Sequence, residues 1–467
     1  MSIVTKNIII PERLQKPLYD FINIFHKKGY ECYLIGGCVR DFLLGNETYD
    51  YDFATNARPE EVMNIFRKVV PTGIKHGTVT VLYGGMEFEV TTYRADGKYL
   101  DGRRPESVSF SDSLEEDVKR RDFTINGLAY DLLSNEIIDL VGGIEDLDKK
   151  IVRTIGNPID RFSEDGLRTY RACRFAAKLD FIIEEETFRA IEKTLHVAEK
   201  ISSERIRDEL FKMLTADKPS KGFEYMRLSG LLKLAMPELD QCYSVEQNKF
   251  HAYDVYYHSI YSCDAAPKEK PLVRLAALLH DIGKVQTRKM SDEGDYSFYN
   301  HEVIGAKIAK RMMRRLKFSN SDIEVVCNLI LNHMFHYTDD WSDGAVRRFM
   351  RKVGVENIPD LFDLREADRI GNGTRMGLPE PIKKLQDRID AIIEAENAIT
   401  VRDLKINGHI IMDRFGLKPG PVIGRILHDL LEMVLDNPEM NEEEILIQKA
   451  EEIYQSLKDE AEGKFSS

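Results

Sequence analysis

The spacing of apolar residues divides the chain into a mixed region and a long helical region. Short β-type runs in the first part predict four strands, at residues 32–35, 51–55, 78–82 and 88–93. Helical patterns lie between these runs, near residues 39–44 and 59–69. After Arg161, apolar residues recur three and four positions apart and predict helices at 167–179, 185–198 and 203–214, the last with Ser203 as its cap.

Two further helical regions complete the pattern. The first begins near Asn248 and is rich in His and Asp, and the second runs from about 376 to 457 with a Gly/Pro loop at 416–424. Together the elements predict an α+β chain, in which an α/β head precedes all-α segments. We place the domains at residues 1–150, 151–240, 241–372 and 373–467.

Composition restricts the class of protein without identifying it. A length of 467 residues suggests about three domains, and 43% hydrophobic with 31% charged residues is ordinary for a soluble globular protein. The sequence has no uninterrupted apolar stretch of ~18 residues and no signal-peptide pattern at its start, so we expect no membrane span. The six cysteines are scattered without a CxxC pair, which indicates reduced thiols in a cytoplasmic protein.

The net charge of −13 changes what can be expected of a nucleic-acid partner. Because phosphate binding relies on Lys and Arg, an acidic chain that binds RNA must gather its cations on one face. Two basic runs, at residues 307–317 and 347–352, are candidates for such a face. Each run alone is equally consistent with a solvated helix surface.

A glycine pair follows the first predicted strand. Gly36 and Gly37 precede a helix that carries Arg40. Glycines allow a backbone to approach phosphates closely, and a helix N-terminus offers free N–H groups. Arg40 can add a guanidinium fork to a triphosphate. A Gly-Gly pair is usually only a turn, so this segment gains meaning from its neighbours.

Carboxylates in two of the predicted strands can form a cation site. Asp50 and Asp52 are two residues apart, so on a strand they point to the same face. Paired carboxylates suit Mg²⁺, which binds one or two of them together with substrate phosphates. A third carboxylate would complete a two-metal site. Glu89 is the best candidate, although Glu87 lies on the same face of its strand and could compete.

A third segment, KRRDFTING at residues 119–127, adds positive charge. Arg120 and Arg121 precede a polar cap and an apolar run. They could anchor phosphates or the end of an RNA, or they could equally belong to a helix cap with surface charge.

Together these segments resemble the class II CCA-adding enzymes and bacterial poly(A) polymerases, which are DNA polymerase β-like nucleotidyltransferases. Within residues 31–215 the resemblance rests on GGCVRDFLLG, YDYDFATNARPEEV, FEVTTYRADGKYLDGRRP, LEEDVKRRDFTINGLAYD and RFSEDGLRTYRACRFAAKL. It implies a polymerase β-like head, a helical neck and body, and Mg²⁺-dependent addition of C, C and A to the 3′ end of tRNA from CTP and ATP. The residues implied to act are Asp50, Asp52 and Glu89 in catalysis, and Gly36, Gly37, Arg40 and Arg121 in nucleotide binding.

The resemblance assigns recognition of the base to Asp165 and Arg168, three apart on a predicted helix. Cytosine and adenine present an amine that donates beside a ring nitrogen that accepts, whereas uracil and guanine present a carbonyl and an N–H. Aspartate only accepts and arginine only donates, so this pair selects C and A together. The resemblance also places Arg171 and Arg174 on the nucleotide side. On a straight helix Arg174 lies about half a turn from Asp165, so we expect it to bind phosphate or to be structural.

A loop after the third strand distinguishes CCA-adding enzymes from relatives that add only CC. Asp101, Arg103 and Arg104, within ADGKYLDGRRP, match the element of enzymes that add A. The resemblance therefore favours complete CCA synthesis or addition of A alone, and it does not separate these two.

Six ligand-type residues have the spacing of an HD-superfamily metal site: His258, His280, Asp281, His301, His333 and Asp368. The adjacent His and Asp, expected on one helix, can enclose a divalent transition metal with the preceding His and the distant Asp. The remaining two histidines could hold a second ion. We interpret His251 and His336, outside this pattern, as structural or RNA-side residues. The preceding QNKFHAYDVYYHSI resembles the HD domain fused to CCA-adding enzymes, which implies a metal-dependent phosphohydrolase.

The last segment resembles the C-terminal tRNA-binding region of the same enzymes. A loop before a predicted helix at Val422 offers N–H groups for phosphates, or it is a plain connection between helices. Three functions stay open: CCA addition with HD phosphohydrolysis, A addition or poly(A) synthesis, and HD phosphohydrolysis with an RNA-binding head. Intact Asp50, Asp52, Asp165 and Arg168 favour the first over the last. The sequence leaves the oligomeric state and the HD metal open.

Overall fold

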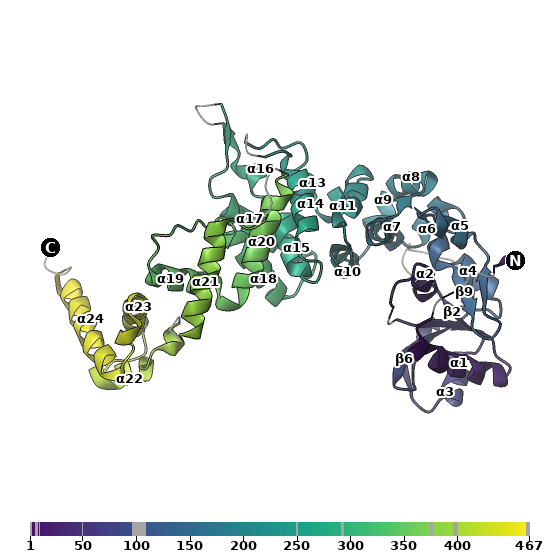
Figure 1. Cartoon of the computed structure of the whole chain (residues 1–467), viewed down its shortest axis with the longest axis horizontal. Helices are drawn as coiled ribbons and strands as arrows, with labels where there is room; N and C mark the ends of the chain where they lie inside the picture. Colours follow the sequence, from purple (N-terminus) through teal and green to yellow (C-terminus); the bar gives the residue numbers. More distant parts are fainter. Residues whose placement is uncertain are drawn as a thin grey trace. The chain divides into compact units, whose positions relative to one another are not determined.

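The computed structural model describes residues 2–4, 8, 10–48, 50–95, 109–248, 251–290, 294–373, 377–395 and 400–463. They form two compact units (Figure 1): Met1–Gln241 with Met312–Phe318, and Cys242–Arg311 with Ser319–Ser467. The loop residues Asp101, Arg103 and Arg104 lie outside the described residues.

The head is built on one mixed sheet in the order β1-β10-β9-β2-β3-β6-β5-β4. Its strands are β1 (Ser2–Val4), β2 (Cys32–Ile35), β3 (Asp52–Thr55), β4 (Val69–Gly73), β5 (Thr78–Tyr83), β6 (Met86–Thr92), β9 (Leu128–Asp131) and β10 (Glu136–Asp139). The four predicted strands are confirmed. The helix predicted at 59–69 is shorter, since α3 (Pro59–Ile65) ends before β4 begins. Only β3 and β6 pair in parallel among the strands of this sheet, and this pairing sets Asp52 opposite Glu89.

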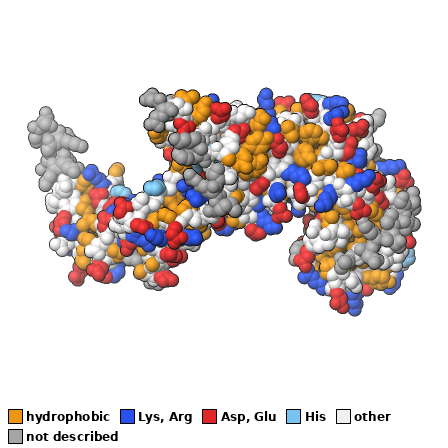
Figure 2. All heavy atoms as spheres, turned by 45° about the horizontal axis from the view of Figure 1, so that its top comes forward, with side chains coloured by type: hydrophobic (Ala, Val, Ile, Leu, Met, Phe, Trp, Pro, Cys, Tyr) orange, Lys and Arg blue, Asp and Glu red, His pale blue; other side chains and the backbone are white. Residues whose placement is uncertain are grey.

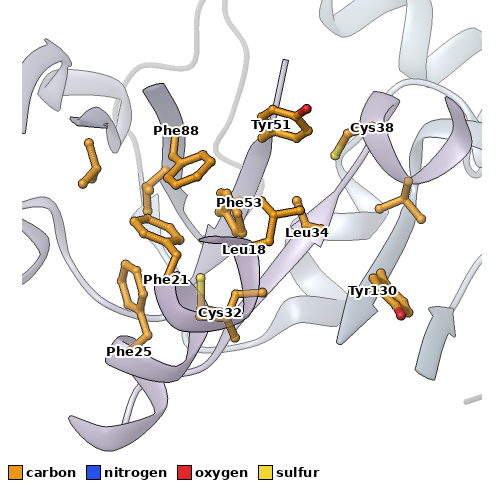
Figure 3. Close-up of a cluster of buried hydrophobic side chains, with 14 of the residues drawn as sticks. Leu18, Phe21, Phe25, Cys32, Leu34, Cys38, Tyr51, Phe53, Phe88 and Tyr130 are labelled. Carbon is orange, nitrogen blue, oxygen red and sulfur yellow. The ribbon is translucent and has the colours of Figure 1, made fainter. Parts of the chain in front are cut away.

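An aromatic core holds helix α1 (Glu12–Lys27) against the sheet (Figure 3). Phe21 lies 4.8 Å from Phe53 and 4.5 Å from Phe88, measured between ring centroids. Both partners come from β3 and β6, the two strands that carry the acidic residues. Burying each such ring contributes roughly 2–3 kcal/mol to folding. The core therefore holds β3 and β6 in place through the sheet face that α1 covers.

A helical neck follows the head within the same unit. Its main helices are α6 (Pro158–Glu164), α7 (Leu167–Leu179), α8 (Glu185–Lys193), α9 (Leu195–Ala198), α10 (Ser203–Leu214) and α11 (Pro219–Leu228). The helix predicted at 185–198 is divided at Thr194, which accounts for α8 and α9. Helix α10 has its N-cap at Ser202, one residue before the predicted cap Ser203.

The second unit is helical apart from one short hairpin. Its first helices are α14 (Val255–Ala265), α15 (Pro271–Leu279), α16 (Lys284–Thr287), α17 (His301–Arg315), α18 (Asn320–Asn332), α19 (Asp343–Val353), α20 (Ile358–Gly371) and α21 (Glu380–Glu394). The tail comprises α22 (Gly408–Phe415), α23 (Pro421–Asp436) and α24 (Glu443–Gly463) around its own apolar core. The predicted loop at 416–424 is shorter than expected, because α23 starts at Pro421 and includes Gly424. The described helices are all too short or too polar to cross a lipid bilayer.

Gly166, between α6 and α7, is packed against backbone. A Cβ at this position would lie 2.8 Å from the Cα of Ala198, and backbone cannot move aside as the end of a side chain can. We expect Gly166→Ala to destabilise the protein by about 1–3 kcal/mol, measured by urea unfolding. Gly424→Ala is the matched control, because Gly424 is helical and faces open space. That change should be neutral or stabilising by up to ~1 kcal/mol, and equal losses in both variants would contradict the packing argument.

Candidate functional site

Three carboxylates lie close together on or just before β3 and β6, two interior strands of the head sheet. Asp52 starts β3, Glu89 is its register partner on β6, and exposed Asp50 lies just before the strand. Burial is the largest cause that raises the pKa of Asp52 to about 6; the charges of Glu89 and Asp50 add to this effect, and Arg121 opposes it. Asp50 was predicted to lie in the strand with Asp52. It lies just before the strand instead, but it is still close enough for its charge to affect Asp52. Both Glu87 and Glu89 have register partners on β5, but the β3–β6 pairing includes Glu89 and stops before Glu87, which favours Glu89 as the third carboxylate.

The glycine turn brings the backbone close to this acidic cluster. Gly36 has a φ of 81°, in the left-handed region that favours glycine, and Gly37 starts helix α2 (Gly37–Leu43). A Cβ on Gly36 would lie 3.2 Å from Nη1 of Arg121 and 4.0 Å from Oδ2 of Asp52. The turn, one arginine and one metal-type carboxylate thus converge on one point. The carboxylate of Asp117 holds Arg121, accepting hydrogen bonds of 3.1 and 3.2 Å.

Arg40 is in a different environment from the one expected for a phosphate ligand. Its side chain is buried, and it donates to Oδ1 of Asp41 at 2.8 and 2.9 Å and to Oδ1 of Asn126 at 2.5 Å. These bonds occupy donors on all three of its nitrogens. The geometry favours a structural role in which Arg40 ties α2 to the segment around Asn126.

Asp165 and Arg168 are held by separate partners. Asp165 lies in the break between α6 and α7, with extended backbone, so it is not on the helix that the sequence predicted. Its carboxylate accepts hydrogen bonds from Arg205 on α10, at 2.7 and 3.3 Å. Arg168 pairs with Glu164 at 2.6 Å and donates to the carbonyl of Arg120 at 3.0 Å. Sequence reasoning missed Arg205, since one arginine on an amphipathic helix carries no local signal.

Two further arginines of α7 pair with buried acids. Arg171 lies 2.6 Å from a carboxylate oxygen of Asp122, and Arg174 lies 2.5 Å from one of Glu209. Arg174 is buried and stacks on the ring of Phe175, 4.1 Å from its centroid. Of the two roles expected for Arg174, these contacts favour the structural one.

The two basic runs differ in their surroundings. In the second run, Arg348 pairs with Glu432 and Arg347 donates to the carbonyl of Leu435, so both guanidinium groups join α19 to α23. In the first, Lys307, Lys310 and Arg311 are exposed on α17. On the face drawn in Figure 2, basic and acidic side chains are interspersed. Only the first run remains a candidate for binding phosphates.

The six ligand-type residues of the second unit form one buried cluster. His258 comes from α14, Asp368 from α20 and His301 from the start of α17, whereas His280 and Asp281 follow the last residue of α15 rather than lying within it. His333 likewise follows the end of α18. Oδ2 of Asp281 lies 3.3 Å from Nε2 of both His258 and His280, and its Oδ1 lies 3.3 Å from Nε2 of His301. Asp281 therefore connects two sets of nitrogen donors.

The tautomers of three histidines are set by the backbone. Nδ1 of His280, His301 and His333 lies 2.6 to 2.8 Å from a carbonyl oxygen three residues earlier. A carbonyl only accepts, so each Nδ1 donates and each neutral ring keeps a lone pair on Nε2. The Nε2 atoms of His301 and His333 are 3.2 Å apart. Two lone pairs at this distance repel unless a cation or an added proton lies beside them, so the donor set fits a metal ion.

Charge in the cluster favours a cation in the same place. Burial and the neighbouring His280 and His301 lower the pKa of His333 to about 3, so this ring is neutral near pH 7. Burial opposes the charged form of His280, but Asp281 and Asp368 outweigh it and raise its pKa to about 10. The two carboxylates thus attract positive charge that a divalent ion can supply.

A cavity of about 650 Å³ opens on this cluster. Lys284, which contacts Oδ2 of Asp281 at 2.6 Å, and Arg365, which contacts Asp368 at 3.0 Å, both line it. His251 also lines the cavity, with its ring 5.4 Å from that of His258 and edge-on to it. His251 and His336 were predicted to be structural or RNA-side residues outside the metal-site pattern; His251 borders the site, whereas His336 is exposed. The fold brings His251 to the site, and the spacing of residues in the sequence did not indicate this.

Comparisons with known proteins agree on the family. Family models described as "Poly A polymerase head domain", "Probable RNA and SrmB- binding site of polymerase A" and "HD domain" match residues 32–153, 180–243 and 250–373. The chain is 34% identical to the CCA-adding enzyme of Ligilactobacillus salivarius over 445 residues, 95% of this chain and 98% of that protein. It is 34% identical to the CCA-adding enzyme of Lactococcus lactis subsp. lactis, over 89% of this chain and 92% of the relative.

Solved structures give the same likeness. The Bacillus stearothermophilus CCA-adding enzyme in complex with CTP superposes with a TM-score of 0.72 and 27% identity, covering 96% of this chain and 100% of that one. The Thermotoga maritima CCA-adding enzyme complexed with tRNA has a TM-score of 0.56 and 22% identity, with 96% of each chain covered. The second likeness concerns the fold alone.

The environment of Asp52 predicts opposite effects on activity and stability. Its pKa, raised from 3.8 to about 6, means that the folded protein disfavours the charged form. We expect Asp52→Asn to abolish nucleotide addition while stabilising the metal-free protein at pH 8 by up to about 3 kcal/mol. The stability difference should be full above pH 6 and should vanish below about pH 4, where both folded and unfolded carboxyls are protonated.

Thermal unfolding in EDTA at several pH values measures this difference. Asp112→Asn is the control, because Asp112 is an exposed carboxylate whose pair with Arg58 contributes little. Near-normal nucleotide addition by Asp52→Asn would remove Asp52 from the catalytic site. Equal stability of the two variants at every pH would remove the electrostatic argument.

Proposed function

The chain belongs to the CCA-adding enzyme family, and we propose that it adds C, C and A to the 3′ end of tRNA from CTP and ATP. The observation that carries the proposal is the convergence of Asp50, Asp52 and Glu89 beside the Gly36 turn, in a chain aligned with such enzymes over nearly its whole length. Intact carboxylates argue against a degenerate head. We place the reaction in the cytoplasm, in line with six cysteines free of disulfides.

The reaction transfers a nucleotidyl group. The 3′-hydroxyl oxygen of the tRNA forms a bond to the α-phosphorus and releases its proton to solvent, the bond from that phosphorus to the bridging oxygen breaks, and diphosphate leaves. Asp50, Asp52 and Glu89 offer only oxygen donors, which fits Mg²⁺. When bound, this ion would supply positive charge to the triphosphate and to the attacking hydroxyl. Arg121, beside Gly36, faces the same point and can bind a phosphate oxygen.

Selection of C and A is assigned to Asp165 and Arg168. An ionised carboxylate can accept about four hydrogen bonds, so Asp165 keeps acceptor capacity for a base amine while it also binds Arg205. Arg205 acts in this proposal as a positioning residue that fixes the direction of the carboxylate. Asp101, Arg103 and Arg104 are proposed to serve addition of the terminal A, on the strength of their sequence alone.

Product length tests the proposal. Labelled CTP and ATP are offered separately and together to tRNA that lacks the whole CCA end, to CC-ending tRNA and to an unrelated RNA. We expect three additions on the first, one A on the second and none on the third. Addition of A alone to CC-ending tRNA would instead identify an A-adding enzyme, and long A tracts on any RNA would identify a poly(A) polymerase.

A second activity is proposed for the HD cluster: hydrolysis of a phosphoester at a tRNA 3′ end. Four histidines and two carboxylates fit one or two divalent transition metal ions, with Asp281 shared between the two sets. Such ions, when bound, would polarise the phosphate and lower the pKa of water. Lys284 and Arg365 line the cavity and can bind phosphate oxygens.

The step balances without another reactant. A water oxygen bonds to phosphorus, the bond from phosphorus to one ribose oxygen breaks, and the proton of the water passes to that oxygen. A 2′,3′-cyclic phosphate opens in this way, and a second hydrolysis releases phosphate. The product is the 3′-hydroxyl group that the head requires, which is a reason to join the two sites in one chain.

Removing two ligands together should abolish this activity and spare nucleotide addition. We expect the unaltered protein to release phosphate from tRNA ending in a cyclic phosphate with Mn²⁺, Ni²⁺ or Mg²⁺, and His280→Ala with Asp281→Ala to release none. The reason is that Nε2 of His280 and Oδ2 of Asp281 lie 3.3 Å apart and would bind the same metal ion. Asp50→Asn, which should block only the head, is the matched control.

Two outcomes would contradict the second proposal. If the unaltered protein opens no cyclic ester with any of these ions, the cluster is a structural metal site or a tRNA-binding element. If the double variant remains active, the ligands are assigned to the wrong reaction.

A further inference from the structure

The cavity over the HD cluster has two chemically different parts. Its floor carries the metal-type ligands, Lys284 and Arg365, and the Nε atom of Arg365 is buried with no hydrogen-bond partner among the described residues. Its lining also includes two exposed apolar side chains, Tyr299 with 82% and Met334 with 55% of their surface accessible. Single exposed apolar residues are common on protein surfaces, but these two line the same cavity as the cations, so the ring face of Tyr299 is available to a ligand there.

The local backbone links Tyr299 to the metal cluster. The carbonyl of Phe298 accepts a hydrogen bond from Nδ1 of His301. Between these two residues, Asn300 adopts a φ of 60°. Nζ of Lys284 lies 5.4 Å from the centroid of the Phe298 ring. Tyr299 is thus carried by the same short turn that orients a metal ligand, one residue beyond Phe298.

We propose that Tyr299 is a specificity-determining residue of the HD site, which stacks on the base of a nucleoside phosphate whose phosphate group is held by Arg365 and Lys284. The inference rests on the proposed hydrolytic function and names the part of the substrate that it recognises. A polar floor with cations and an aromatic edge suits a molecule with an anionic end and a flat apolar end. The cavity of about 650 Å³ has room for one terminal nucleotide.

Stacking should be tolerant of the base and should not depend on the tyrosine hydroxyl. Base–aromatic stacking contributes to the binding of every base, so its loss should weaken nucleotide binding roughly ten-fold or more. Tyr299→Phe keeps the ring and should retain the affinity of the unaltered protein, whereas Tyr299→Ala should lose it. A sugar phosphate without a base should bind equally to all three proteins.

Calorimetric titration of the full chain in EDTA separates binding from turnover. The probes are adenosine 3′-monophosphate and ribose 5-phosphate, and every protein carries Asp165→Ala and Arg168→Ala to remove base recognition in the head. Tyr243→Ala is the matched control, since Tyr243 is exposed in the same unit but does not line the cavity. We expect a ten-fold weaker affinity for the nucleotide in Tyr299→Ala alone, with ribose 5-phosphate unaffected in every protein.

Several results would overturn the proposal. They are unchanged nucleotide affinity in Tyr299→Ala, an equal loss in Tyr299→Phe, or an equal loss for ribose 5-phosphate. The hydrolytic proposal fails by a different result: nucleotide binding that depends on the Tyr299 ring, together with no hydrolysis of cyclic-phosphate-ended tRNA with any ion. In that case the cavity is a nucleotide-binding site and not a catalytic one.

Discussion

The parallel pairing of β3 with β6 is the constraint on which the head depends. It sets Asp52 opposite Glu89, and like charges at this separation repel. Burial first and the charge of Glu89 second raise the pKa of Asp52, and the aromatic core around Phe21 holds the two strands together in spite of this repulsion. A cation shared by the carboxylates would relieve the repulsion. The aromatic core therefore holds in place the strands that bring the carboxylates together.

The arginines around Phe175, from the head and the neck, are neutralised by neighbouring carboxylates rather than by a bound ion. Arg40, Arg171 and Arg174 all lie within 5.4 Å of the Phe175 centroid, and the acids Asp41, Asp122 and Glu209 neutralise them. Three guanidinium groups can share one small region because each has its own carboxylate and a common aromatic face. This explains why an arginine-rich helix contributes few free cations for phosphate.

Sequence reasoning located most elements, because period-2 and period-3.6 patterns are set by which side chains are buried. It also brought the HD ligands together correctly, since six residues at that spacing have few other uses. It could not identify Arg205, Asp117 or His251 as neighbours of the sites, because their importance comes from helices meeting in space. Nor could it separate a cation that is free from one already paired, and Arg40 and Arg174 show this limit. The break between α6 and α7 excludes Asp165 from the helix, and Gly166 at this break packs against Ala198, a neighbour that is distant in sequence.

The HD ligands have a consequence for the behaviour of the unfolded chain. His258 and Asp368 come from α14 and α20, which are far apart in sequence, and the other four ligand-type residues lie where helices begin or end. An ion bound to all of them acts as a cross-link that closes several long loops at once. In polymer terms, closing a loop restricts chain entropy by an amount that grows only slowly with its length. One ion can therefore restrain distant helices of this unit much as a set of disulfides would, in a chain whose described cysteines are all free.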